Sequence, residues 1–185
     1  MIRYFEIVKN LLCMKNTLII YSTTDGQTKK ICMRLVELSK RKSEITLCEI
    51  ENAPKIDLSQ YRKIIIGASI RYGNYRKELF EYISKNIEIL SKKENAFFSV
   101  NVVARKEEKN TKDTNPYISK FLSSTEWKPK MIDVFGGVVD YPSYKFFDKF
   151  MIRLIMYITK GPVDTKNRYE FTDWERVQKF SSLLS

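Results

Sequence analysis

The sequence predicts an α/β fold in which a parallel sheet carries helices on both faces. Three observations lead to this prediction. Five short apolar runs have the length of strands, and longer segments separate them. In several of these segments the apolar residues recur every three or four positions, which is typical of a helix that packs on a sheet. The 185 residues, 43% of them hydrophobic, fit one domain with a sizeable core.

The apolar runs are the predicted strands, and the segments with helical spacing are the predicted helices. The strands are Leu18–Tyr21, Ile45–Ile50, Ile64–Ala68, Ala96–Val100 and Met131–Phe135. The helices are Gln27–Lys40, Arg76–Leu90 and Thr172–Leu184. In a doubly wound sheet, ligands bind beyond the carboxyl ends of the strands. The turns that follow the strands therefore form the rim from which a function is predicted.

The first of these turns, Ser22–Thr28, joins a strand to a helix start and is rich in hydroxyl groups. Free amides at a helix N-terminus attract an anion, and the hydroxyls add further donors, so the turn predicts a phosphate site. It has neither the Gly-Lys-Ser/Thr ending of a Walker loop nor the three spaced glycines of a dinucleotide loop. The alternative is a polar turn with helix-capping residues. We expect the Asp25 carboxylate to point outward or to cap the helix.

The turns after the third and fourth strands suit a planar ring, and a third turn follows the fifth strand. The first is Gly67–Tyr75, in which two glycines allow close backbone approach and two tyrosines offer flat faces for stacking. The others are Ser99–Lys106 and Gly136–Pro142. Together with the phosphate turn they predict a site for a phosphorylated heteroaromatic molecule. Each turn taken alone is also compatible with an ordinary loop.

Charge and composition limit the classes of partner and of catalytic site that this chain can have. Lys and Arg number 33 against 22 acidic residues, and the net charge of +11 predicts an anionic partner such as acidic lipid, nucleic acid or an acidic small molecule. The sequence contains no histidine, which excludes Ser-His and Cys-His catalysis and histidine metal sites. Its cysteines, Cys13, Cys32 and Cys48, show no CxxC spacing, so we expect no metal centre and a reducing, cytoplasmic environment.

A basic amphipathic segment, Ser143–Thr159, lies between the fifth strand and the last predicted helix. It combines phenylalanines and aliphatic residues with cations, as in helices that lie on an anionic membrane surface. The candidate membrane contacts are Lys145, Phe146, Lys149, Phe150 and Arg153. The alternative is that its apolar side packs on the sheet. Residues 1–13 are predicted to be an extension outside the core.

These motifs together resemble a known family, the flavodoxin-like, quinone-dependent protoporphyrinogen IX dehydrogenases of bacterial haem biosynthesis. The resemblance covers nearly the full length, but residues 1–13 have no counterpart. The segments that carry it are Leu18–Thr28, Ile66–Gly73, Phe98–Lys106, Tyr141–Pro142, Asp148–Met156 and Tyr169–Glu175.

The resemblance implies a flavodoxin-like domain over residues 14–185, with strand order 2-1-3-4-5 and a basic amphipathic insertion at 143–160. It also implies an oxidoreductase that removes six electrons from protoporphyrinogen IX to form protoporphyrin IX. The electrons would pass through FMN to a respiratory quinone, either menaquinone or ubiquinone. The expected location is the cytoplasm, with peripheral attachment to the inner membrane.

By the same resemblance, FMN contacts come from all of the rim turns. Those expected at the phosphate are Ser22, Thr23, Thr24, Asp25, Gly26, Gln27 and Thr28. Those expected around the ring are Ser69, Ile70, Arg71, Tyr72, Gly73, Ser99, Val100, Asn101, Val102, Val138, Val139, Asp140 and Tyr141. Tyr72 is the leading candidate for stacking. The redox step belongs to the flavin, so no side chain is assigned as a catalytic acid or base.

Cations on the rim are candidates for pairing with the two propionates of the substrate, with Arg71 as the first choice. The set is Arg71, Arg76, Lys77, Arg105 and Lys106. Two alternatives stay open on the same fold: an electron carrier or an NAD(P)H:quinone reductase. Carrier flavodoxins are usually acidic, unlike this chain. A basic nucleic-acid-binding domain is a more distant alternative that leaves the ring and phosphate turns without a purpose, so we expect no nucleic-acid partner.

Overall fold

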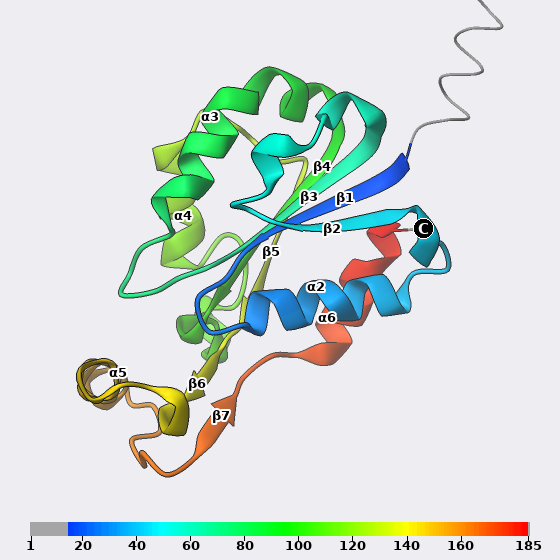
Figure 1. Cartoon of the computed structure of the whole chain (residues 1–185). Coiled ribbons are helices and arrows are strands. Elements are labelled where there is room, and N and C mark those ends of the chain that lie inside the picture. The colour runs from blue at the N-terminus through cyan, green and yellow to red at the C-terminus, as the bar shows by residue number, and fades with distance from the viewer. Residues whose placement is uncertain (1–14, 185) are drawn as a thin grey trace, which may run out of the picture.

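The computed structural model describes residues 15–184, and the predicted extension at 1–13 lies outside this range. The central strands are β1 (Lys15–Ser22), β2 (Ile45–Glu49), β3 (Tyr61–Ser69), β4 (Glu94–Asn101) and β5 (Met131–Gly136). They form one parallel sheet in the order β2-β1-β3-β4-β5 (Figure 1). The predicted α/β class and strand order are confirmed.

Strand β3 shows why apolar runs become strands that are buried on both faces. Ile64, Ile65 and Ile66 are consecutive, yet all three are fully buried. Successive side chains of a strand point to opposite faces, so Ile64 and Ile66 belong to one core cluster and Ile65 to the other. The sheet therefore has two cores, and each needs its own covering helices.

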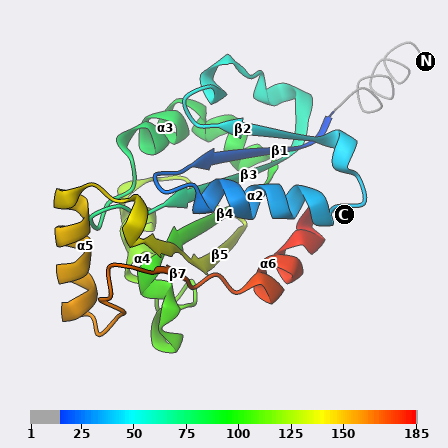
Figure 2. The same ribbon diagram turned by 60° about the horizontal axis from the view of Figure 1, so that its bottom comes forward.

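Two pairs of helices supply that cover (Figures 1 and 2). They are α2 (Gln27–Leu38) and α6 (Trp174–Phe180) on one face, with α3 (Lys77–Lys92) and α4 (Pro116–Ser124) on the other. Three of the four were predicted. The predicted final helix, 172–184, corresponds to α6 continued by a 3-10 turn at Ser181–Leu184.

Helix α4 was not predicted, although its start carries local signals. The Asn115 side chain caps it by accepting a hydrogen bond from the backbone N–H of Tyr117, and Pro116 occupies the first turn. The helix is only nine residues long, about two and a half turns, and buries just Ile118 and Phe121, so its apolar pattern is too short to stand out in the sequence.

The segment 138–170, which includes the predicted insertion at 143–160, lies beyond the carboxyl ends of the sheet. It contains β6 (Val138–Asp140), a 3-10 turn (Tyr141–Ser143), α5 (Phe146–Ile158) and β7 (Arg168–Glu170), with β6 and β7 paired in antiparallel fashion. Figure 2 shows α5 set apart from the helices that cover the sheet. The predicted amphipathic segment is thus a helix carried on a two-stranded ribbon.

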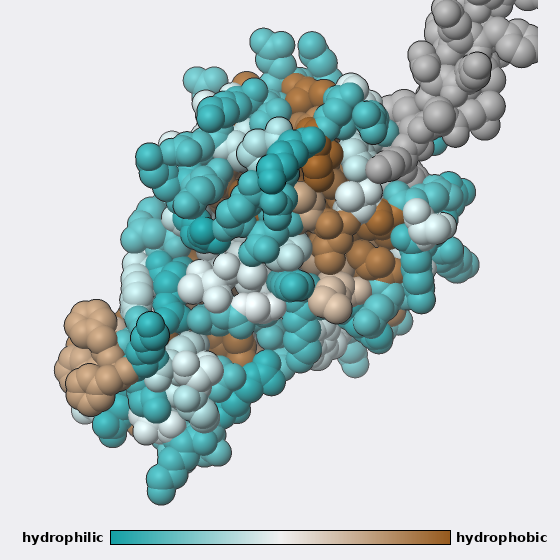
Figure 3. All heavy atoms as spheres, viewed as in Figure 1, coloured by the Kyte–Doolittle hydropathy of each residue, from teal (hydrophilic) through white to brown (hydrophobic). Residues whose placement is uncertain are grey.

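Helix α5 exposes most of its apolar side chains. Of its thirteen residues, all of them described, only Met156 is buried. Its exposed large apolar side chains are Phe146, Phe147, Phe150, Leu154, Ile155, Tyr157 and Ile158. In Figure 3 a tan apolar group stands out from the surface where α5 lies in Figure 1. The apolar side of the predicted segment therefore does not simply pack on the sheet.

Within residues 15–184 no helix combines the length and the apolar character needed to cross a bilayer.

Candidate functional site

The turn between β1 and α2 has hydrogen-bonding capacity that the described residues do not use. Gly26 adopts a left-handed conformation, with φ of 80°, immediately before α2. The hydroxyls of Ser22, Thr23 and Thr28 are buried and find no hydrogen-bond partner among residues 15–184. Each such orphaned group costs about 1–3 kcal/mol. Acceptor oxygens seated at this helix start would satisfy them, so the turn fits a phosphate group.

Two of the remaining polar side chains of this turn, Gln27 and Asp25, are already engaged. Gln27 donates its side-chain amide to Thr172 at 2.7 Å and to Glu170 at 3.2 Å, which ties the turn to β7 and the segment after it. Thr24 is exposed. Asp25 accepts a bidentate ion pair from Arg71. The first turn of α2 has no acidic residue and no side-chain cap. Of the two expectations for Asp25, capping of the helix is therefore wrong, because the arginine 46 residues away binds its carboxylate; the residue itself is exposed.

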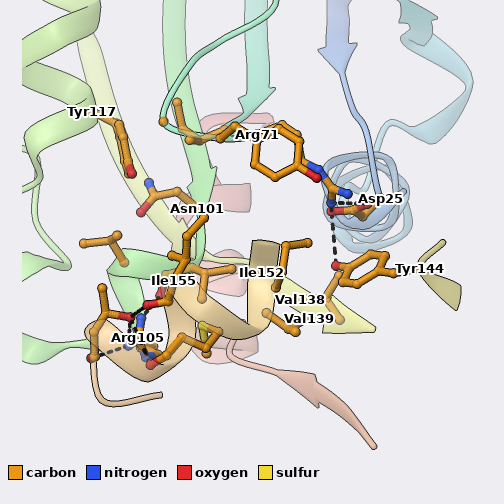
Figure 4. A pocket seen from close by; sticks show the side chains of 17 residues that line it. Asp25, Arg71, Asn101, Arg105, Tyr117, Val138, Val139, Tyr144, Ile152 and Ile155 are labelled. Carbon is orange, nitrogen blue, oxygen red and sulfur yellow. Dashed lines mark hydrogen bonds and ion pairs between the residues drawn. The ribbon is translucent and has the colours of Figure 1, made fainter. Parts of the chain in front are cut away.

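Two adjoining cavities extend from this turn to α5. The smaller, of about 30 Å³, lies at the phosphate turn and is lined by Thr23, Gln27, Ser69 and Val100, among others. The larger, of about 110 Å³, lies beneath α5 (Figure 4). The residues that line both are Asp25, Ile70, Asn101, Val102 and Val138. These shared residues place the two cavities next to each other, between the phosphate turn and the helix.

Most of the predicted ring contacts lie on these walls. The larger cavity is lined by the whole stretch Ile70–Gly73, by Asn101 and Val102 after β4, and by Val138 and Val139 of β6. Others lie behind the walls. Among them, Ser99 is buried within a hydrogen-bond network, and Tyr141 is buried and donates its hydroxyl to the Pro162 carbonyl at 2.9 Å. Which of these residues contact FMN remains a prediction.

The sequence prediction missed several lining residues. They are Val103, Tyr117, Tyr144, Ile152, Ile155, Met156 and Thr159. Four of these belong to α5 or follow it directly, in a segment that was predicted to contact the membrane or to pack on the sheet but not to line the ring site. Its apolar residues occur all around the helix, so the sequence offered a signal for burial but not for which side faces the ring site.

The turn after β4 is fixed by a buried polar network. Asn101 accepts a hydrogen bond from the Ala104 N–H at 3.0 Å and donates to Ser99 at 3.1 Å. Tyr75 donates its hydroxyl to Ser99 at 2.9 Å, and burial raises the pKa of Tyr75 well above its ordinary value. A Cβ atom at Gly136 would collide with the Phe171 carbonyl, so only glycine fits there. This wall of the site is therefore rigid.

The turn after β3 is a tight hairpin. Arg71 and Asn74 exchange two backbone hydrogen bonds of 3.0 Å, and the two central residues have positive φ, 48° for Tyr72 and 78° for Gly73. This geometry is natural for Gly73 but uncommon for a tyrosine. It holds Tyr72 partly exposed at the mouth of the larger cavity.

Arg71 is the centre of a charged cluster. Its Nη2 lies 3.5 Å from an Asp148 oxygen, and its guanidinium carbon lies 4.9 Å from the ring centres of Tyr72 and Tyr144. Tyr72 also donates its hydroxyl to Asp148. Burial raises the pKa of Asp25 above its ordinary value, against the opposing effect of Arg71.

The other predicted substrate cations divide into two groups. Arg105 lines the larger cavity and donates to the backbone carbonyls of Val102 at 3.0 Å and Thr159 at 2.7 Å. By contrast, Arg76 pairs with Glu51, and Lys77 pairs with Glu81 at 2.8 Å. Neither of these two residues, nor Lys106, lines the cavities beside α5. The structure thus brings Arg71 and Arg105 together at the site and leaves the others outside it.

Comparison with known proteins places this geometry in a family. The model of the flavodoxin domain matches residues 18–166. The fold is similar to that of oxidised flavodoxin 1 from Bacillus cereus, with a TM-score of 0.53 and 14% identity over 91% of this chain and 96% of that one.

Two relatives are much more similar in sequence, and both are named protoporphyrinogen IX dehydrogenase [quinone]. The Escherichia coli K12 protein is 40% identical over 166 residues, which cover 89% of this chain and 92% of the relative. The Leishmania major protein is 40% identical over 169 residues, which cover 89% of this chain and 72% of that protein. The chain therefore belongs to the flavodoxin-domain family and, within it, to the family of quinone-dependent protoporphyrinogen IX dehydrogenases.

Proposed function

We propose that this protein binds FMN and uses it to oxidise protoporphyrinogen IX to protoporphyrin IX, with a respiratory quinone as electron acceptor. The observation that carries the proposal is the set of three orphaned hydroxyls at the start of α2, which opens into a cavity lined by the turns after β3 and β4. Membership of the dehydrogenase family supports the choice of reaction.

In this proposal the phosphate turn binds the phosphate of FMN, and the cavity walls hold its ring. Ser22, Thr23 and Thr28 donate hydrogen bonds to the phosphate, together with the free amides of α2. Ile70–Gly73 and Asn101–Val102 hold the ring. Bound FMN supplies the redox chemistry, which the side chains around the cavity lack. The protein's part is to orient the substrate against the ring and to exclude water.

Arg105 is the preferred anchor for a substrate propionate. Its guanidinium lines the cavity, and its hydrogen-bond partners are uncharged oxygens of Val102 and Thr159. Within residues 15–184 no carboxylate forms an ion pair with it. Arg71, by contrast, is already paired with Asp25 and Asp148. A carboxylate entering the site therefore gains more from Arg105 than from Arg71.

Attachment to the inner-membrane surface is the second part of the proposal. Phe146, Phe150, Leu154 and Tyr157 recur at three- and four-residue spacing and are all exposed, so they form one apolar strip along α5. Lys149 and Arg153 come one residue before Phe150 and Leu154, which places them along one edge of the strip. A helix of this kind inserts shallowly among acidic lipids, where a quinone is also available.

A donor comparison tests the proposed reaction against the alternatives on the same fold. The protein is loaded with FMN, which is verified from the flavin absorption spectrum. It is then supplied in separate reactions with protoporphyrinogen IX or NAD(P)H, with a quinone as acceptor. The proposal predicts porphyrin fluorescence that depends on both FMN and quinone. Quinone reduction by NAD(P)H without any porphyrinogen turnover would favour the quinone reductase instead.

A further inference from the structure

Helix α5 forms the outer wall of the larger cavity, yet it is thinly anchored. Ile152, Ile155 and Met156 face the cavity, and only Met156 among the helix residues is buried. The C-terminal end is held by Arg105, which donates to Thr159. The N-terminal end is held by Asp148, which accepts the Tyr72 hydroxyl and pairs with Arg71 at 3.5 Å. Apart from Met156 and Ile152, which pack in an apolar cluster with Val139 and Tyr141, these polar contacts at the two ends fix the position of this wall.

Two side chains connect the region of that wall to the phosphate turn: Arg71, and Tyr144, which lies just before α5 and donates its hydroxyl to Asp25 at 3.4 Å. Arg71 binds Asp25 with one terminal nitrogen, at 2.8 and 2.9 Å, and approaches Asp148 with the other. Tyr72 and Tyr144 both contribute cation–π contacts to it. The three connected segments are the turn after β1, the hairpin after β3 and the first turn of α5. Figure 4 shows the Arg71–Asp25 pair beside Tyr144.

The cavity is too small for the molecules that the proposed function requires. Its volume is about 110 Å³, whereas sites for drug-sized ligands run to roughly 300–1,000 Å³. A flavin ring with a tetrapyrrole beside it needs more room still. The sheet side of the cavity is fixed by the buried network of Asn101 and Ser99. The wall that can yield is α5.

We propose that Arg71 is a positioning residue that latches α5 to the phosphate turn through Asp148 and Asp25. Release of Asp148 lets α5 move outward and admits the substrate over the ring site. The identity of the substrate in this inference rests on the proposed function, but the contact between Arg71 and Asp148 can be tested without any substrate. The latched state restricts access, so the competent open state is a fraction of the population.

Hydrogen exchange of the full-length protein tests the latch directly, with and without FMN. Asp148→Asn removes the carboxylate from α5, and Arg71→Gln removes its partner while leaving the sequence of α5 intact. Both variants are expected to speed amide exchange in 146–158 by roughly two- to fivefold, the range of a partly exposed ion pair. Exchange in α3 stays unchanged. Arg34→Gln, which removes the exposed Arg34–Glu37 pair on α2, is the matched control and leaves 146–158 at the wild-type rate.

Steady-state kinetics of Asp148→Asn test the link to the substrate. Because unlatching raises the open fraction, KM for protoporphyrinogen IX should fall by up to about fivefold, with a smaller change in kcat. A purely structural role predicts a higher KM. Unaltered exchange in 146–158 would overturn the latch, and faster exchange with an unchanged or higher KM would overturn its role in admission. If the wild-type protein does not turn over porphyrinogen, the proposed function is refuted. The hydrogen-exchange measurement still tests the latch in that case, because it uses no substrate.

Discussion

Arg71 Nη1 lies 2.9 Å from Oδ1 and 2.8 Å from Oδ2 of Asp25, so one arginine nitrogen binds both oxygens of a carboxylate that sits inside the phosphate turn. A carboxylate at this place repels a dianionic phosphate, and the arginine offsets that repulsion. We therefore expect the pair to affect cofactor binding, in line with the prediction of Arg71 as an FMN contact, while its other predicted role, pairing with the substrate, is the weaker one.

The Arg71–Asp25 pair predicts that substitution of Arg71 and substitution of Asp25 change the Kd of FMN in opposite directions. Arg71→Ala leaves the Asp25 charge uncompensated and should raise the Kd of FMN by about tenfold, the scale of one charge-assisted hydrogen bond. Asp25→Asn should lower it. The double variant should bind FMN more tightly than Arg71→Ala alone. Flavin fluorescence titration of all four proteins measures this cycle, and strictly additive losses from both single variants would contradict the account.

The pKa of Asp25 predicts a pH-dependent stability. Burial raises this pKa in the folded state, so the folded protein binds a proton that the unfolded chain releases. The stabilising contribution is complete below the unfolded pKa and is lost as pH rises through the folded pKa. The Tm of wild type relative to Asp25→Asn should therefore be highest in acid and fall as pH rises above about 4, the ordinary range of an aspartate. Scanning calorimetry of both proteins in the absence of FMN measures this difference in Tm. A difference that grows in favour of wild type as pH rises would reject the prediction.

The orphaned hydroxyl of Thr28 predicts that its removal weakens FMN binding without lowering the stability of the FMN-free protein. Thr28→Val removes a buried group that has no partner within residues 15–184, so the Tm of the FMN-free protein should stay level or rise. FMN should bind at least about tenfold more weakly, because a hydrogen bond to a charged group is lost. Thr125→Val, far from the phosphate turn, is the control. Equal FMN affinity in Thr28→Val and wild type would remove Thr28 from the phosphate site.

Arg105 is expected to act on the substrate and not on the cofactor. Arg105→Gln should raise KM for protoporphyrinogen IX by about tenfold or more, the scale of one charge-assisted pair. The Kd of FMN should stay within about twofold, the scatter expected of a site with no direct contact. Lys106→Gln is the matched control, since Lys106 does not line the cavity. If both variants behave alike, the propionate anchor lies elsewhere.

The apolar strip of α5 predicts binding to acidic lipid. Replacing both Phe146 and Phe150 with serine should reduce flotation with anionic liposomes by at least about tenfold, because two large apolar side chains no longer insert. Met33→Ser, which changes an exposed apolar residue on α2, should float like wild type. Neutral liposomes should bind all three proteins weakly. Undiminished flotation of the double variant would exclude α5 as the membrane contact.

The sheet was predictable because its strands are apolar runs of strand length. Besides α4, two features escaped prediction for physical reasons. Strands β6 and β7 have three residues each, too few for a periodic signal. The Arg71–Asp25 pair joins residues 46 positions apart. Local sequence signals such as helix capping cannot reveal a contact of this kind.

The candidate site, like the fold, has one part that was predictable from the sequence and one part that was not. The phosphate and ring turns were predictable, because the carboxyl ends of parallel strands share one rim. The contribution of α5 was not. Its periodicity marks an apolar helix, but periodicity alone does not say which side faces the protein and which faces lipid. The structure resolves this for Ile152 and Met156, which face the cavity, and for Phe146 and Phe150, which face outward.

The most direct test of the central claim is a single anaerobic reaction. FMN-loaded protein is mixed with protoporphyrinogen IX in the absence of quinone, and flavin absorbance and porphyrin fluorescence are followed together. The account predicts loss of the oxidised flavin spectrum, and its return when a quinone is added. A flavin spectrum that stays oxidised in the presence of excess protoporphyrinogen IX would contradict it.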